Sequence, residues 1–146
     1  MRTAIVGVGN SLMRDEGVGV HVARALVDAH LPEGTRVIDA GTDPDVAFDL
    51  DGFDRVIVVD AVLGGEPPGT VYRFGNEVEL DASGSHRACH DVGLLEILRK
   101  TARRRPEVVI LGVEPDEIDW GLDLSPVVRC SVHRVIEVVQ QELRRP

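Results

Sequence analysis

Five short apolar runs along the chain have the length and composition of β-strands. They occupy residues 3–7, 35–39, 54–60, 70–74 and 107–113. The run at 54–60 (DRVIVVD) is the clearest, because its consecutive aliphatic residues are typical of a strand buried on both faces. The run at 70–74 follows a loop rich in Gly and Pro that is too short to hold a crossover helix. We therefore expect this strand to be antiparallel and near a sheet edge.

Between these runs, apolar residues recur at helical spacing. A first helix is predicted to begin after Asp15, which is a good N-cap residue. A short helix is predicted over 44–51, a further one near His90, and a last one after Ser125 and Pro126, a typical N-cap and first helical residue. The apolar stripes of the three longer helices are Val18, Val22, Ala25 and Leu26; Leu94, Leu95 and Leu98; and Val128, Val132, Val135, Val139 and Leu143.

The alternation of strands and helices predicts an α/β fold. We expect a three-layer sandwich with a central twisted, mostly parallel sheet of about five strands and helices on both faces. The first three strands should be parallel, with the first between the second and the third, and joined by right-handed crossovers. The 146 residues fit one ordinary domain and contain no internal repeat, so we predict a single domain over residues 1–146.

Composition and charge narrow the function classes. The net charge of −9 argues against a nucleic-acid partner, which requires clustered positive charge. The one basic run, Arg99 to Arg105, lies where we place a helix C-terminus, and there it complements the helix dipole. Cys89 and Cys130 form no CxxC pair or disulfide framework, which indicates a reducing compartment. With no membrane span and no signal peptide expected, we predict a cytoplasmic protein.

Polar residues gather where the predicted strands end, and ligands of open α/β sheets bind beyond the carboxyl ends of the strands. The residues placed there are Asn10, Asp15, Glu16, Asp39, Gly41, Thr42, Asp60 and His90. Two carboxylates and one imidazole can bind a divalent transition metal such as nickel, zinc or iron. We therefore predict a metal site at Glu16, Asp60 and His90. The substrate contacts that we predict are Asn10, Asp39, Gly41 and Thr42.

Each of these three residues also has a plain structural explanation. An Asp at the end of a strand can satisfy loop amides, as Asp60 would. An acidic residue in the first turn of a helix, such as Glu16, is favoured by the dipole. A His at the start of a helix, such as His90, can bond to its own loop. Their common position at one rim of the predicted fold is what favours a functional site.

Three other chemistries are less well supported by the sequence. The segment GVGN begins a dinucleotide fingerprint, but position 12 is Leu where the third glycine is needed. His86 and His90 are four residues apart, yet the zinc-protease pattern HExxH is absent. Ser11 has no evident base, Cys89 adjoins His90 in an unproductive geometry, and no GxSxG elbow occurs.

The motifs in their order resemble one family. GVGNSLMRDEGVGVHVARAL (7–26) resembles the opening signature of the hydrogenase maturation endopeptidases. Further similar segments are DAGT (39–42), VIVVDAV (56–62), PGT (68–70), CHDVGLLEIL (89–98), GVEP (112–115), Gly121 and LSPVV (124–128). The resemblance therefore covers essentially the whole chain.

This resemblance implies an activity that composition alone does not indicate. Members remove a short C-terminal extension from the large-subunit precursor of nickel-iron hydrogenase after nickel has been inserted. By matching motif positions, nickel would be sensed by Glu16, Asp60 and His90. The nickel would come with the substrate, and no organic cofactor is expected.

The sequence does not determine the mechanism by which the peptide bond is hydrolysed. Nickel could polarise the carbonyl or activate water, or Glu16, Asp60 or Asp39 could be the general base. A noncatalytic nickel-binding assembly factor for the same precursor is the alternative function.

Overall fold

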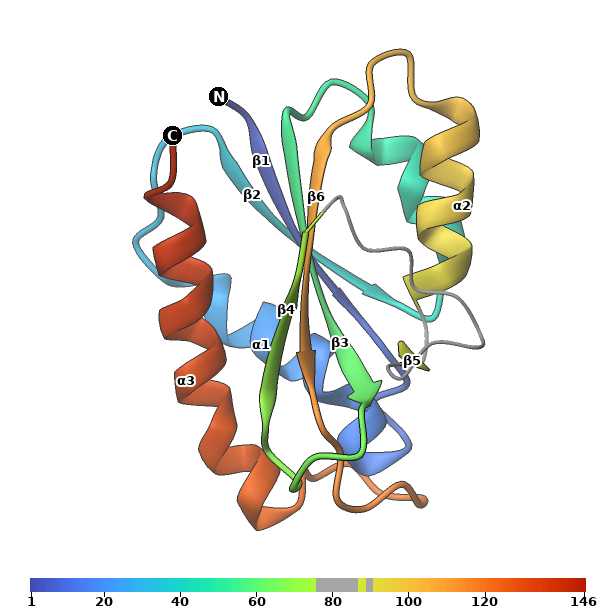
Figure 1. The fold of residues 1–146 in the computed structure, drawn as a ribbon, viewed down its shortest axis with the longest axis vertical. Coiled ribbons are helices and arrows are strands. Elements are labelled where there is room, and N and C mark those ends of the chain that lie inside the picture. The colour runs from blue at the N-terminus through green and yellow to red at the C-terminus, as the bar shows by residue number, and fades with distance from the viewer. Residues whose placement is uncertain (76–86, 89–90) are drawn as a thin grey trace.

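A twisted sheet lies at the centre of the protein, between helices (Figure 1). The computed structural model describes residues 1–75, 87–88 and 91–146. The strands are β1 (Thr3–Val8), β2 (Thr35–Gly41), β3 (Arg55–Leu63), β4 (Val71–Phe74), β5 (Arg87–Ala88) and β6 (Glu107–Val113). Their order is β2-β1-β3-β6-β4, and the two-residue β5 pairs with β3 outside this path.

The strand directions confirm the predicted topology. β1 lies between β2 and β3 and is parallel to both, and β3 is parallel to β6. β4 is the antiparallel edge strand, paired with β6. β3 is longer than predicted, because it continues past Asp60 to Leu63 and gains the antiparallel partner β5 there.

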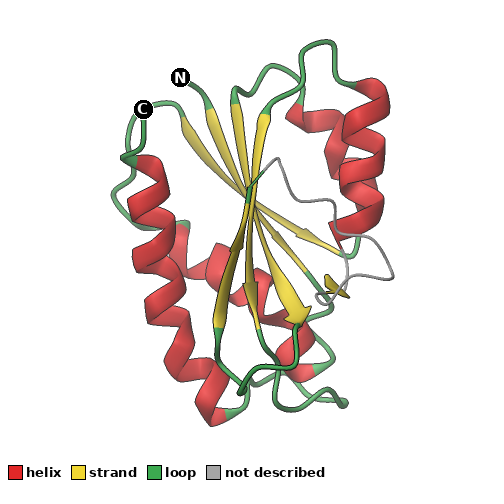
Figure 2. Cartoon of the chain, viewed as in Figure 1, coloured by secondary structure: helices red, strands yellow, loops and turns green. Residues whose placement is uncertain are grey.

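Helices cover both faces of the sheet, as predicted (Figure 2). The helical elements are the 3₁₀ helices η1 (Arg14–Gly17) and η2 (Pro44–Leu50) and the α-helices α1 (Val18–Leu26), α2 (Asp91–Thr101) and α3 (Pro126–Leu143). α1 and α3 lie on one face, and α2 and η2 lie on the other. The predicted short helix over 44–51 is thus a 3₁₀ helix.

Two apolar cores result, one on each face of the sheet. Leu94 and Leu98 of α2 pack with Leu50 of η2 on one side. On the other side, the predicted stripe of α3 packs with Val18, Val22 and Leu26 of α1. Ala25 was placed in the α1 stripe by its spacing, but it is exposed and its neighbour Ala23 is buried. None of the helices in the described part of the chain is long and apolar enough to cross a bilayer.

Candidate functional site

Asp60 lies at the carboxyl rim of the sheet, where β1 has already ended. The pairing of β1 with β3 stops at Gly7 and Val59, so Asp60 is the next β3 residue, and within the described residues its paired neighbour is Gly112 of β6. The Asp60 side chain is fully buried, and its Oδ1 accepts a hydrogen bond of 2.8 Å from the amide of Ala61. The sequence placed Asp60 at the end of its strand, but the strand continues beyond it and Asp60 is buried within β3.

Glu16 lies at the same rim, in η1. Its backbone sits directly against the chain that leaves β1, because a β-carbon at Gly9 would collide with the Glu16 carbonyl oxygen. Three residues later, Gly19 lets the first turn of α1 touch β3, because a β-carbon there would collide with the carbonyl oxygen of Val59. These two close approaches bring the half-buried Glu16 to the end of the sheet that carries Asp60.

The third predicted ligand, His90, lies outside the described residues, as do His86 and Cys89. The set Glu16, Asp60 and His90 therefore stays a prediction. Among residues 1–75, 87–88 and 91–146, no group of three or more His, Cys, Asp or Glu side chains is close enough to hold a metal ion. Glu16 and Asp60, two of the three predicted ligands, lie at one rim of the sheet, and their role as metal ligands stays a prediction.

Asp15 does not cap α1, and that prediction is wrong. The 3₁₀ turn η1 intervenes, and α1 has Gly17 at its N-cap. The fully buried Asp15 carboxylate instead accepts hydrogen bonds of 2.8 to 2.9 Å from the amides of Asp116, Glu117 and Ser125. It also accepts one of 2.7 Å from the Ser125 hydroxyl. Asp15 thus fixes η1 to the loop that precedes α3.

These contacts keep the Asp15 carboxylate ionised by lowering its pKa. Burial on its own would raise the pKa of this carboxyl, but the hydrogen bonds from Glu117, Ser125 and Asp116 outweigh burial and lower it. Asp15 therefore stays ionised beside Glu16. Sequence reasoning missed this role because the partners lie about a hundred positions away, at separations of 101 to 110 residues.

The predicted substrate contacts lie around the ends of β1 and β2. The Asn10 side-chain oxygen accepts from the amide of Leu12, which closes a turn in the loop after β1. Gly41 has a left-handed backbone (φ 53°), its carbonyl accepts from the Gly9 amide, and Thr42 beside it is exposed. The Asp39 carboxylate lies 3.3 Å from Arg24 in a surface ion pair. Their role in substrate binding stays a prediction.

Glu114 is a further buried carboxylate, and the sequence analysis did not single it out. Its Oε1 accepts from the amides of Gly64 and Glu66 and from the Tyr72 hydroxyl, at 2.8 to 3.2 Å. It therefore fixes the Gly- and Pro-rich loop after β3. Burial, followed by the hydrogen bond to Glu114, raises the pKa of Tyr72 to about 12.

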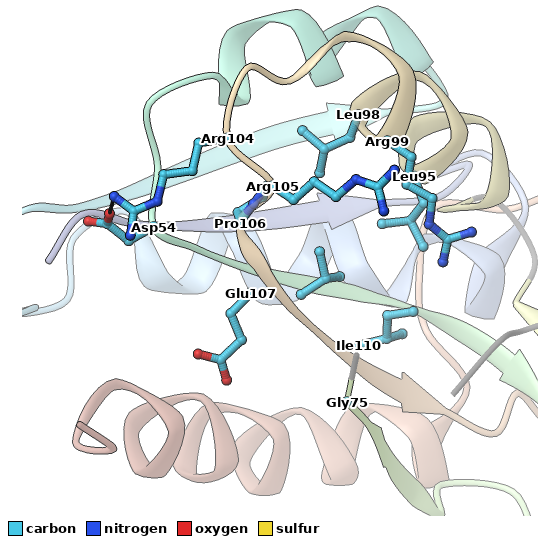
Figure 3. A pocket seen from close by; sticks show the side chains of 11 residues that line it. Asp54, Gly75, Leu95, Leu98, Arg99, Arg104, Arg105, Pro106, Glu107 and Ile110 are labelled. Atoms are coloured by element: carbon cyan, nitrogen blue, oxygen red, sulfur yellow. Dashed lines mark ion pairs between the residues drawn. The ribbon is translucent and has the colours of Figure 1, made fainter. Parts of the chain in front are cut away.

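A pocket of about 570 Å³ opens at the opposite, amino end of β3 and β6 (Figure 3). Leu95 and Leu98 of α2 and Ile110 of β6 form its apolar part, and Arg99, Arg104 and Arg105 lie around it. Because ligands of such sheets bind at the carboxyl ends of the strands, this pocket is separate from the candidate site.

The chain belongs to the hydrogenase maturation protease family (HycI), which matches residues 20–142. It is 30% identical to the hydrogenase 2 maturation protease of Escherichia coli K12, over 99% of this chain and 92% of that one. The fold is similar to NiFe hydrogenase maturation protease HybD from Thermococcus kodakarensis (TM-score 0.83, 29% identity, 99% and 100% of the two chains). It is also similar to the hydrogenase maturating endopeptidase HybD from Escherichia coli (TM-score 0.82, 28% identity, 99% and 93%). The predicted family and fold are confirmed, and the family's activity is that of a hydrogenase maturation endopeptidase.

Proposed function

We propose that this protein removes the C-terminal extension from the nickel-loaded precursor of a nickel-iron hydrogenase large subunit in the cytoplasm, and that it recognises the nickel carried by that substrate. One observation carries the proposal most directly. Two carboxylates, of Glu16 and Asp60, belong to the same rim of the sheet, and Asp60 is fully buried within β3. Two carboxylates at one rim would strongly attract an approaching divalent cation.

Recognition of nickel gives the enzyme a way to distinguish loaded from unloaded precursor. A loaded precursor brings a divalent cation to Glu16 and Asp60, with His90 as the third ligand. An unloaded precursor brings no cation, so its docking would cover carboxylates without compensating their charge. Because two carboxylates and one imidazole are an incomplete coordination sphere, we propose that the ion stays with the substrate.

Hydrolysis needs a water molecule to add to the scissile carbonyl carbon, and the amine to take a proton as the C–N bond breaks. Nickel would polarise that carbonyl or activate the water, with a carboxylate as general base. Of the three candidates, Asp39 is exposed to solvent, whereas Glu16 is half-buried and Asp60 is buried at the rim. Glu16 and Asp60 are therefore the two that we propose for this role.

The test is incubation of the purified protein with precursor prepared with and without nickel, followed by mass spectrometry of the large subunit. We expect a shortened subunit only with nickel. Treating the enzyme with a chelator, and removing it before the substrate is added, should leave processing unchanged. If zinc restores activity on nickel-free precursor after such treatment, the protein is a conventional metalloprotease. Binding without shortening would favour the alternative, a noncatalytic assembly factor.

Variants separate the proposed ligands from other carboxylates of the chain. Asp60→Asn, Glu16→Gln and His90→Ala should each reduce processing by about 100-fold or more. Asp28→Asn is the control, because it removes an exposed carboxylate outside the proposed ligands and substrate contacts and should process nearly normally. Circular dichroism should show an unchanged fold in all four variants. Equal losses in Asp28→Asn and Asp60→Asn would argue against the proposed ligand set.

A further inference from the structure

Exposed apolar side chains gather on two loops beside Glu16. The two rim loops, residues 10–14 and 116–123, run side by side at the lower edge of the molecule (Figure 1). Leu12 lies on the first, and Ile118, Trp120 and Leu122 lie on the second. Trp120, the chain's single tryptophan, is 75% exposed and Leu122 is 67% exposed. Large apolar side chains grouped on a surface often mark a contact with another protein.

These side chains are held on a stiff support. The amide of Arg14 donates to the Gly121 carbonyl at 3.0 Å, and the amide of Gly121 donates to the Leu12 carbonyl at 2.9 Å. Arg14 also forms an ion pair of 2.6 Å with Glu117, and its own backbone is left-handed (φ 48°). A left-handed non-glycine residue persists only where its surroundings enforce it.

The buried Asp15 carboxylate, which directly follows the first rim loop, accepts two hydrogen bonds from amides of the second rim loop and two from Ser125 just after it. A surface fixed in this way loses little conformational entropy when a partner binds.

The charge around the apolar side chains indicates which side chains the partner should carry. Exposed Asp116, Glu117, Asp119 and Asp123 alternate with the apolar residues of the second rim loop. Only Glu117 of these has an ion pair within the described residues, with Arg14. A second copy of this chain would bring like charges together, and the whole chain carries −9. The complementary partner is a polypeptide segment with apolar and basic side chains.

We propose that the rim loops are a docking surface for the precursor itself, and that they bind an apolar, basic segment of the large subunit near its nickel site. This inference rests on the proposed function, because it takes the precursor as the substrate. Trp120 and Leu122 provide most of the apolar contact, and the acidic side chains orient the segment so that its metal reaches Glu16.

The first test compares Trp120→Ala and Leu122→Ala with a control, Val27→Ala. Val27 is 63% exposed but follows α1 at the opposite end of the sheet. The Kd for nickel-loaded precursor, from calorimetry, should rise about tenfold or more in the two rim variants and stay unchanged in the control. At saturating precursor the processing rate should stay within about twofold of the wild-type rate in all three, since the proposed ligands are intact. Unchanged Kd values in both rim variants would overturn the docking surface.

A second test does not require cleavage. With 5-fluorotryptophan incorporated only into this protein, its single tryptophan gives one ¹⁹F signal. The signal should move when unlabelled precursor is added, and it should not move when the protein alone is concentrated. A shift on self-concentration, with a dimer in sedimentation that Trp120→Ala abolishes, would assign the surface to a second copy and overturn the proposal.

The outcomes distinguish this inference from the proposed function. If the wild-type protein binds precursor through Trp120 without shortening it, the endopeptidase proposal fails and the docking surface holds. If it shortens the precursor and both rim variants bind normally, the docking surface fails alone. If it neither binds nor shortens the precursor, both proposals are wrong.

Discussion

The two ends of α3 are anchored by buried charges of opposite sign. At its N-terminus, on the carboxyl rim of the sheet, the Asp15 carboxylate accepts from the amide and hydroxyl of Ser125. At its C-terminus, the guanidinium of the buried Arg55 donates to the carbonyl of Glu142 at 2.8 Å, and to the carbonyls of Arg145 and Pro146 at 3.2 Å. Helix ends expose amides at one side and carbonyls at the other, so each end needs a different partner.

The two buried charges differ in how far the groups that they bind are exposed to water. Asp15 binds groups of the loop that holds the rim together, and Ser125 is itself fully buried. Arg55 binds carbonyls of Arg145 and Pro146, which are exposed, and its ionic partner Glu107 is about half exposed. Water can replace the lost donor at the carbonyls of Arg145 and Pro146 but has little access to Ser125. The anchor at the rim should therefore matter more, both for stability and for function.

Asp15→Asn should have the largest effect. One oxygen that accepts from three donors becomes an amide nitrogen that faces them, and hydrogen bonds to a charged group contribute about 1.5–3 kcal/mol each. We expect a loss of about 3 kcal/mol in the free energy of unfolding, measured by urea denaturation, together with impaired processing. Asp28→Asn, at an exposed position after α1, is the control and should change neither.

The contribution of Asp15 should also depend on pH in a defined direction. Because its pKa is lowered in the folded protein, its stabilisation is complete above the unfolded value of about 3.9 and is lost as the pH falls through the folded value. The difference in unfolding free energy between wild type and Asp15→Asn should thus be constant at neutral pH and shrink below about pH 4. A difference that grows on acidification would contradict this assignment.

Arg55→Met should have a smaller effect, about 2 kcal/mol, because exposed carbonyls regain water. Processing of the precursor should be retained, since the change lies at the amino end of the sheet. The comparison between the two ends is wrong if Arg55→Met abolishes processing while Asp15→Asn preserves it.

Glu114→Gln tests the buried carboxylate that holds the loop after β3. It should lower the free energy of unfolding by about 1 kcal/mol, because the amide oxygen can still accept from Gly64 and Glu66. The pKa of Tyr72 is the more sensitive measurement for this variant. Removing the neighbouring charge should bring its pKa down from about 12, while burial keeps it above the ordinary value. Tyr72 is the chain's single tyrosine, so absorbance at about 295 nm during an alkaline titration reports this one group. An unchanged titration would mean that Glu114 does not influence it.

Arg24→Ala should have the smallest effect. Its ion pair with Asp39 is exposed on both sides, and such pairs contribute less than about 1 kcal/mol. Thermal unfolding should be nearly unchanged, and adding salt should reduce the difference further. A loss comparable with that of Asp15→Asn would mean that the Arg24–Asp39 pair is part of the rim's support.

The sequence predicted the layers of the fold better than the construction of the rim. Aliphatic runs specify buried strands locally, so β6 was predicted with its observed limits, and the loop before β4 indicated its direction. Asp15 was misinterpreted because capping rules consider only neighbours in sequence. Its partners come from a loop brought close by the fold.

Two further differences have local causes. Asp60 was placed at the end of a strand, although Ala61, Val62 and Leu63 continue the apolar run and bury it. No packing role was predicted for Gly9 or Gly19, whereas their lack of a side chain lets η1 touch the chain after β1 and lets α1 touch β3. Close contact between backbones leaves little signal in a hydrophobic pattern.

The hydrogen bonds between Asp15 and Ser125 also determine when the rim can form during protein synthesis. Glu16 and Asp60 are translated early, but the hydrogen bonds of Asp15 that hold the loop beside Glu16 come from residues 116–125, which are translated more than fifty positions after Asp60. The chain is synthesised from its N-terminus, so Glu16 and Asp60 are present before the residues that bind Asp15. The ribosome must release the segment around Ser125 before this rim can close.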